Sequence, residues 1–163
     1  MTRRARTHIL LAGGTGLVGR ALTQQLLAQV PRPALQMLVR RKPDDADGRA
    51  QWLVVDFAAL PALPAADEAY CCLGTTIKQA GSQAAFRAVD FDAVLAFARA
   101  AKAAGATRFA VVSALGASAR SSTFYNRVKG EMETAVAGLG FDSVVIARPS
   151  LLAGEREALG QPA

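Results

Sequence analysis

Residues 10–22, LLAGGTGLVGRAL, decide the fold of this chain. An apolar run ends at Ala12, glycines follow at positions 13, 16 and 19, and apolar residues then recur at helical spacing. Gly13 can adopt the dihedral angles of a tight turn. Gly16 leaves space for an anion to approach the backbone, and Gly19 lets the helix pack closely against the strand. The stretch therefore predicts a strand, a glycine turn and a helix in direct succession.

A helix that starts at such a turn presents free N–H groups and partial positive charge to a ligand. The spacing G-x-x-G-x-x-G is a weak signal by itself, and an ordinary glycine-rich turn is the alternative. Its position between a strand and a helix is typical of a site for the pyrophosphate of a dinucleotide. The residues predicted to contact the cofactor here are Gly13, Thr15, Gly16, Leu17, Val18 and Gly19.

Strand and helix patterns alternate along the rest of the chain. Several predicted strands are continuous apolar runs, such as HILLA, FAVVS and SVVIA, which is typical of strands buried on both faces. We therefore expect a doubly wound α/β fold, a parallel sheet with helices on both faces, in a single domain over residues 1–163. Strands are expected over residues 8–12, 35–40, 52–56, 69–73, 108–113 and 144–147. Helices are expected over 17–29, from about 86 to 105, and from about 124 to 138, with no convincing helix between the second and third strands.

Basic residues follow the second predicted strand, where many dinucleotide-binding proteins have an acid that bonds the ribose 2′-OH. Arg40 and Arg41 suit an anionic 2′-phosphate, so the sequence favours NADP(H), with NAD(H) as a possible second cofactor. A solvated basic turn is the alternative. Asp56 ends the third predicted strand and could accept a hydrogen bond from the adenine amino group, or simply cap its loop.

Composition excludes several classes of protein. The chain has 163 residues, 52% of them hydrophobic and 20% charged, and we expect a soluble, cytoplasmic globular protein without a membrane span. The apolar run that follows the N-terminal arginines is too short for a signal peptide. Two adjacent cysteines and one histidine argue against a disulfide framework and a metal site. The net charge of +6 is scattered and lacks interleaved aromatics, which disfavours a nucleic-acid partner.

A second motif lies at residues 125–129, Y-x-x-x-K. Residues four apart share one face of a helix, so Tyr125 and Lys129 are expected to be neighbours. A nearby ammonium favours the phenolate form of a tyrosine, which makes the phenol a better acid–base group at neutral pH. The motif alone is common and mostly structural, but it gains weight from the glycine turn and from Ser113 upstream.

These stretches together resemble the short-chain dehydrogenase/reductase superfamily, and most closely its atypical Tat-interacting-protein, NmrA-like members. The resemblance implies a Rossmann fold with strand order 3-2-1-4-5-6 and a nicotinamide cofactor. It also implies that the loop containing Leu73, Gly74, Thr75 and Thr76 lies along the cofactor and that Pro149 lies near the nicotinamide amide. It is carried by GGTGLVG, LVRR, CCLGTTIKQAGS, FRAVDFD, VVSALGAS, YNRVKGEME and ARPSLLAG.

The chain departs from this superfamily at three places. The second hydroxyl residue expected after the fifth strand is Ala114, so Ser113, Ser121 or Ser122 would have to polarise a carbonyl. The asparagine often found in the long helix is replaced near Asp90. The segment that covers the substrate in relatives is expected to be short or absent.

Two functions follow as hypotheses, with a third resting on charge alone. The first is an NADP(H)-dependent oxidoreductase that moves a hydride to or from an unknown carbonyl-like substrate. Tyr125 would transfer the proton, with Ser113 completing the catalytic set. Lys129 would assist Tyr125 and also bond the cofactor ribose. The second is a redox sensor that binds the cofactor and a protein partner without turnover. The third, a nucleic-acid binder, rests only on the net charge.

Overall fold

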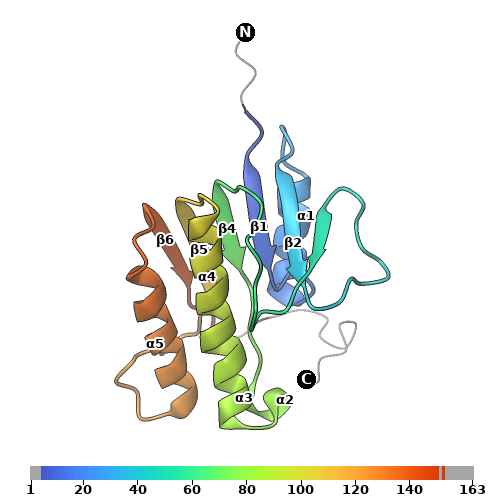
Figure 1. Ribbon diagram of the computed structural model, residues 1–163. Helices are drawn as coiled ribbons and strands as arrows, with labels where there is room; N and C mark the ends of the chain where they lie inside the picture. Colours follow the sequence, from blue (N-terminus) through green and yellow to red (C-terminus); the bar gives the residue numbers. More distant parts are fainter. Residues whose placement is uncertain (1–4, 151, 153–163) are drawn as a thin grey trace.

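Six parallel strands form one sheet in the order β3-β2-β1-β4-β5-β6. The structure, a computed structural model, describes residues 5–150 and residue 152 (Figure 1). This arrangement confirms the predicted doubly wound parallel sheet and its strand order. The strands are β1 (His8–Ala12), β2 (Ala34–Val39), β3 (Gln51–Val54), β4 (Glu68–Cys71), β5 (Arg108–Val112) and β6 (Ser143–Ala147).

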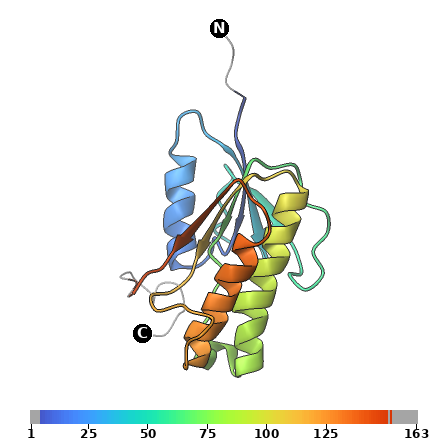
Figure 2. The same cartoon turned by 90° about the vertical axis from the view of Figure 1, so that its left-hand side faces the viewer.

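Helices lie on both faces of the sheet, as Figure 2 shows edge-on. Helix α1 (Leu17–Leu27) covers one face, and α4 (Val94–Ala103) and α5 (Phe124–Ala137) cover the other. Each face has its own apolar core. Leu26 and Leu27 of α1 pack with Met37 of β2, whereas Phe97 of α4 and Met132 of α5 belong to the larger core on the opposite face.

The central strands are buried because they have neighbours on both sides and helices above and below. In β1, the four residues from position 9 to Ala12 are all buried, whereas alternate residues of the edge strand β6 remain exposed. Such continuous burial explains why β1 is an unbroken apolar run rather than an alternating one.

Some predicted boundaries differ from the structure. The long helix predicted from about residue 86 to residue 105 is composite: α3 (Gln83–Arg87) continues through a π-helical turn, η1 (Ala88–Ala93), into α4. A short helix, α2 (Ile77–Ala80), lies in the segment predicted as a loop and begins at the Thr76 hydroxyl, which accepts a hydrogen bond from Gln79 N. Helix α1 ends at Leu27 rather than at residue 29, and the strand boundaries differ from prediction by at most two residues.

The two connections around β3 contain no helix in the structure, as the sequence led us to expect for the first of them. The first connection, residues 40–50, is tied to the sheet by the indole of Trp52 on β3, whose Nε1 donates a hydrogen bond to Asp47 O at 3.0 Å. All six strands run in the same direction, so the loops that follow β1, β2, β3 and β4 meet at one edge of the sheet. Ligands of open α/β sheets bind at this carboxyl edge.

Candidate cofactor and active site

The glycine turn after β1 is built by two close backbone approaches. Gly13 has φ of +80°, and a Cβ there would lie 2.5 Å from Cys72 O and Leu73 N, which follow β4. A Cβ on Gly19 would overlap the Gly13 carbonyl oxygen and lie 2.7 Å from Gly14 Cα. Only glycine at these two positions lets α1 and the segment after β4 pack against the turn.

The turn leads into α1 without a side-chain cap. Gly16 is the N-cap residue, and its carbonyl oxygen accepts a hydrogen bond from Arg20 N at 2.9 Å. The first turn of α1 contains Leu17 and Val18 and no acidic residue. The N-terminus of α1 therefore keeps the partial positive charge that an anion would neutralise.

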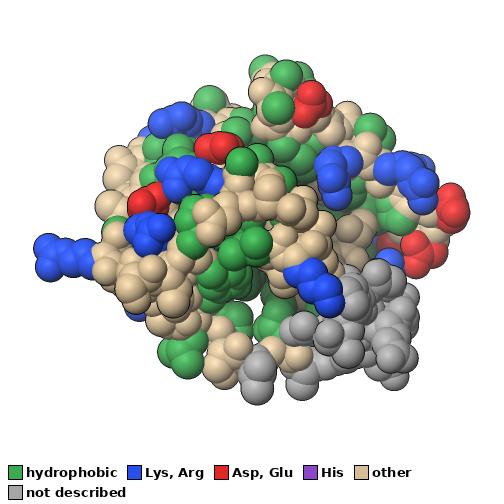
Figure 3. All heavy atoms as spheres, turned by 90° about the horizontal axis from the view of Figure 1, so that it is seen from below, with side chains coloured by type: hydrophobic (Ala, Val, Ile, Leu, Met, Phe, Trp, Pro, Cys, Tyr) green, Lys and Arg blue, Asp and Glu red, His purple; other side chains and the backbone are tan. Residues whose placement is uncertain are grey.

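A groove of ≈ 1340 Å³ runs along the carboxyl edge of the sheet, from the glycine turn to the side of α4. Figure 3 shows a central hollow on this face of the molecule, with hydrophobic side chains around it. Nine of the predicted cofactor-binding residues line this groove: Gly13, Thr15, Gly16, Arg40, Arg41, Asp56, Leu73, Gly74 and Thr75. The other predicted cofactor residues, Leu17, Val18, Gly19, Lys129 and Pro149, are not among its lining residues.

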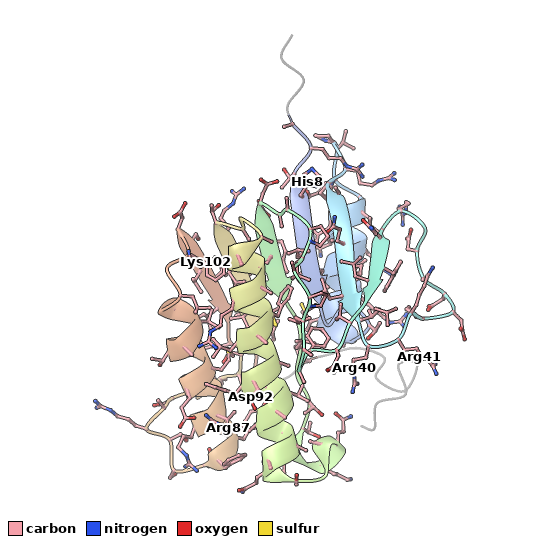
Figure 4. All side chains as sticks on the ribbon, in the orientation of Figure 1. His8, Arg40, Arg41, Arg87, Asp92 and Lys102 are labelled. Carbon is pink, nitrogen blue, oxygen red and sulfur yellow. The ribbon has the colours of Figure 1, made fainter. Side chains whose placement is uncertain are left out.

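Arg40 and Arg41 follow β2 directly and are exposed at the groove (Figure 4). Neither guanidinium forms an ion pair with a carboxylate in the part of the chain that the structure describes. Asp56 lines the same groove, and its Oδ1 accepts a hydrogen bond from Ala58 N at 2.9 Å. Asp56 therefore caps its loop. Because it also lines the groove, this is compatible with the second predicted role, a hydrogen bond from the adenine amino group.

The wall of the groove opposite the glycine turn comes from η1 and α4. It is formed by Asp92, Leu95, Ala96 and Arg99 among others, none of which the sequence pattern singled out. Leu95 and Ala96 are apolar and half-buried, whereas Asp92 and Arg99 are exposed. The amphipathic pattern of the helix shows which residues face the core, but it does not reveal which of the others face a groove.

A buried ion pair lies beneath the loop after β4. Lys129 Nζ is 2.5 Å from Asp90 Oδ1, and the two side chains are 4% and 0% exposed. The other carboxylate oxygen of Asp90 accepts a hydrogen bond from Thr75 N at 3.0 Å. Gly74 lies directly over the pair, since a Cβ there would be 3.5 Å from Asp90 Oδ1 and 3.8 Å from Lys129 Nζ. The pair therefore supports the loop that was predicted to lie along the cofactor.

Burial raises the pKa of Asp90, and this shift is opposed by the Lys129 ammonium and the Thr75 N–H. The carboxylate depends on these two partners to remain charged in the interior. Lys129 was predicted as the partner of Tyr125, but its nearest charged group is Asp90. Its Nζ lies 6.0 Å from the centroid of the Tyr125 ring, which packs against Phe86 at 5.1 Å between centroids.

A second ion pair continues from the same helix face to the end of β6. Arg148 donates two hydrogen bonds to Glu133, one of them from Nε to Oε1 at 2.9 Å. Although burial alone would raise it, the bonds from Arg148 hold the pKa of Glu133 below its ordinary value, with help from Ser113 and Lys129. Ser113 is buried beside this carboxylate. Four charges of alternating sign thus connect η1 to the residue before Pro149.

The hydroxyl residues near the active-site helix have different surroundings. Ser121 Oγ lies 3.1 Å from Thr123 Oγ1 and accepts a hydrogen bond from Thr123 N, so it shapes the turn before α5. Ser122 is exposed, and Ala114 is buried where the superfamily usually has a hydroxyl. Of the three serines considered, Ser113 alone is buried next to the charges of α5.

The cysteines carry no reactive thiolate. Burial raises the pKa of Cys71 to about 12 and that of Cys72 to about 11, so both thiols are protonated at neutral pH. Residues 5–150 and 152 contain no cluster of three or more His, Cys, Asp or Glu residues that could hold a metal ion. No helix within these residues has the length and apolar character needed to cross a membrane.

Comparison with known proteins gives the family. A protein family described as NAD(P)H-binding matches residues 13–158. The chain belongs to this NAD(P)H-binding family, within the atypical short-chain dehydrogenase/reductase group. This confirms the resemblance found in the sequence and the nicotinamide dinucleotide as the ligand class.

Two relatives are similar to this chain over most of its length. It is 36% identical to "Protein HTATIP2" of Rattus norvegicus over 156 residues, which cover 91% of this chain and 64% of the relative. It is 33% identical to "Protein fmp52, mitochondrial" of Emericella nidulans, covering 92% of this chain and 69% of the relative. The chain thus spans about two thirds of the length of these proteins.

Solved structures share the fold. The Bordetella bronchiseptica enzyme WbmG in complex with NAD matches with a TM-score of 0.69 and 16% identity, over 99% of this chain and 63% of that one. A short-chain dehydrogenase/reductase superfamily protein from Agrobacterium tumefaciens with bound NAD matches with a TM-score of 0.68 and 20% identity, over 86% of this chain and 48% of that one. At these identities the likeness concerns the fold.

Proposed function

We propose that this protein is an NADP(H)-dependent oxidoreductase that acts on a carbonyl-like substrate. One observation carries the proposal: a single groove joins the glycine turn, the Arg40–Arg41 pair and the Gly74–Thr75 loop. The buried Asp90–Lys129 pair lies directly under that loop. A dinucleotide laid along this groove would reach from the arginines to the side of the sheet that carries Tyr125.

The arginines support NADPH over NADH. Two exposed guanidinium groups without described ion-pair partners can bond a 2′-phosphate without first breaking another contact. A free 2′-OH has no charge to offer them. The pyrophosphate would bind at the N-terminus of α1, where Gly13 and Gly16 leave the backbone accessible.

Residues of α5 and β5 would then serve the chemistry. The nicotinamide ring supplies or accepts a hydride when the cofactor is bound. Tyr125 would give or take the proton at the carbonyl oxygen, and Ser113 would polarise that carbonyl. Lys129 is buried against Asp90, so it would support the Gly74–Thr75 loop beside the cofactor. Pro149 is fixed close to the loop after β5, because its carbonyl oxygen accepts a hydrogen bond from Leu115 N at 3.0 Å.

Turnover tests this proposal directly. NADPH oxidation is followed with aldehydes, ketones, quinones and enones, for the unmutated protein and for Tyr125→Phe. Loss of the transferable proton is expected to lower kcat by about 10²–10⁴-fold, while NADPH affinity hardly changes. A Tyr70→Phe variant serves as the matched control, since Tyr70 lies on β4 and its hydroxyl is hydrogen-bonded to Glu68.

The alternative is a redox sensor that binds the cofactor and a protein partner without turnover. Ala114 in the place of the usual second hydroxyl favours it. A protein that binds NADPH, oxidises none of it on this panel and is indifferent to Tyr125→Phe would support the sensor. A cytoplasmic location is also a prediction. Because several relatives are named mitochondrial, imaging of a tagged chain is the experiment that tests it.

A further inference from the structure

Arg20 of α1 is an arginine of the cofactor groove that the sequence pattern did not single out. It lines the groove together with Thr15, Arg40 and Arg41. Unlike Arg40 and Arg41, it already contacts a carboxylate among the described residues, since its Nη1 lies 3.3 Å from Asp45 Oδ2. The groove therefore contains a cation whose charge is partly opposed before any ligand binds.

Two contacts hold the Arg20 side chain across the glycine turn. Its Nε donates a hydrogen bond to Thr15 O at 3.0 Å, and its Nη1 reaches Asp45 in the connection that follows β2. The two side chains of the ion pair are 44% and 69% exposed, and ion pairs so open to water are weak. The bond to Thr15 O fixes the side chain at Nε, whereas the Nη atoms at its tip can exchange one anionic partner for another.

Arg20 is shared by two cavities, one of which contains Asp45. A smaller cavity of ≈ 190 Å³ lies between α1 and the connection after β2, and Asp45 lines this cavity but not the groove. Gly14, Thr15 and Arg20 line both cavities, so Arg20 is the charged side chain that they have in common. Its guanidinium therefore lies at the boundary between a carboxylate and the space proposed for the cofactor.

We propose that Arg20 is a specificity-determining residue that exchanges Asp45 for the 2′-phosphate of NADP(H). This inference rests on the proposed NADP(H) function. A phosphate monoester carries a charge of about −1.5 to −2 near pH 7 and three acceptor oxygens, so it competes well with one carboxylate for a guanidinium. Arg20 contacts the connection that begins at Arg40 and Arg41, which favours the 2′-phosphate as its ligand. The pyrophosphate would instead bind the backbone N–H groups of the glycine turn.

Removal of the two partners should change NADPH affinity in opposite directions. Arg20→Met keeps the apolar stem and removes the charge, and it should weaken NADPH binding by about three- to tenfold. Asp45→Asn removes the competing charge and should strengthen NADPH binding by about two- to fivefold, the range expected for an exposed ion pair. NADH has no 2′-phosphate, so its affinity should stay within about twofold in both variants.

Calorimetric titration with NADPH and with NADH measures these changes. Asp44→Asn is the matched control for Asp45→Asn, because Asp44 is its exposed neighbour and forms no ion pair with Arg20. Arg49→Met is the control for Arg20→Met, because Arg49 is paired with Asp47 and does not line the groove. Each control removes the same charge as its test variant and should leave NADPH affinity within about twofold, since water and salt screen exposed charges.

A double variant separates competition for Arg20 from direct repulsion between Asp45 and the phosphate. In an Arg20→Met background the carboxylate has no guanidinium to hold, so Asp45→Asn should leave NADPH affinity unchanged. A gain that persists in this background would indicate repulsion and overturn the proposed exchange. Because Asp45 is exposed, Asp45→Asn by itself tests the proposal where Arg20→Met does not fold.

Unchanged NADPH affinity in both Arg20→Met and Asp45→Asn would overturn the proposal. Equal losses of NADPH and NADH affinity in Arg20→Met would place this residue at the pyrophosphate and overturn it as well. The expected affinity changes without any NADPH turnover would contradict the oxidoreductase and leave this inference standing. Turnover with unchanged affinities would do the reverse.

Discussion

Replacing Lys129 by methionine should cost this protein much of its stability, quite apart from any chemistry. The ammonium is 4% exposed and lies 2.5 Å from a fully buried carboxylate, so water cannot take its place. Methionine keeps most of the apolar stem of the lysine but removes the charge. Asp90 is then left in the interior with Thr75 N as its described hydrogen-bond donor.

The cost can be worked out from the ionisation of that carboxylate. An unfolded aspartate ionises with a pKa of 3.8. The free energy of folding of the variant is most favourable when Asp90 is protonated. Because pH 7 is about three units above that pKa, protonating the carboxylate at pH 7 costs about 4 kcal/mol. The figure agrees with the 3–5 kcal/mol that breaking a buried pair usually costs.

The sign of the pH dependence follows from the same step. The variant takes up a proton when it folds, so its stability falls as the pH rises, relative to the unmutated protein. The deficit should therefore shrink from about 4 kcal/mol at pH 7 to about 2 kcal/mol at pH 5. Adding Asp90→Asn to Lys129→Met removes the titrating group and should recover most of the loss, with no dependence on pH in this range.

Urea-induced unfolding at pH 5 and pH 7 measures these differences. Lys102→Met is the matched control, since Lys102 is exposed on α4 and bonds a backbone carbonyl, and it should change the free energy of unfolding by about 1 kcal/mol or less. A Lys129→Met deficit below about 1 kcal/mol at pH 7, or one that is equal at both pH values, would refute the reasoning.

Three further outcomes are expected. Gly19→Val should lower the free energy of unfolding by about 1–3 kcal/mol or more in denaturation experiments, because its Cβ would overlap the turn that α1 packs on, and a neutral result would contradict this packing. Arg148→Met should lower the free energy of unfolding at neutral pH, and the difference should disappear as the pH falls below 4.5, because the lowered pKa of Glu133 gives stability only while that carboxylate is ionised; a difference independent of pH would count against it. Calorimetry should show NADPH binding at least about tenfold more tightly than NADH, and Arg40→Ala with Arg41→Ala should erase the preference; equal affinities in the unmutated protein would end this idea.

The fold could be predicted because its signals are local. A parallel strand buried on both faces must be apolar throughout, and the four residues from Ile9 to Ala12 show this. The glycine turn is equally local, since the positive φ of Gly13 and the close approach at Gly19 both require residues without a side chain. Strand ends were less certain because the hydrogen bonds that end a strand depend on neighbouring strands that no single segment contains.

The site was harder to predict because its decisive contacts join distant segments. The spacing of Tyr125 and Lys129 predicts neighbours on one helix face, but the partner of Lys129 comes from η1, 39 positions earlier in the sequence. The hydrophobic periodicity around residue 90 gives no sign that a π-helical turn replaces an α-helical one. An aspartate in such a helix normally lies in solvent, so its burial becomes evident only once α5 is packed against it.

The chain of charges from Asp90 to Arg148 connects the two loops on which both functional hypotheses depend. Asp90 holds the loop after β4 through Thr75 N, and Arg148 precedes Pro149 at the end of β6. Between them Lys129 and Glu133 occupy successive turns of α5, so a cofactor that displaced either loop would act on the same helix that carries Tyr125. A reductase needs that helix to hold a proton donor in place, and a sensor needs it to report that the cofactor is bound. The geometry of α5 serves either role, so the distinction between them rests on the chemistry of Tyr125 and Ser113 rather than on the cofactor groove.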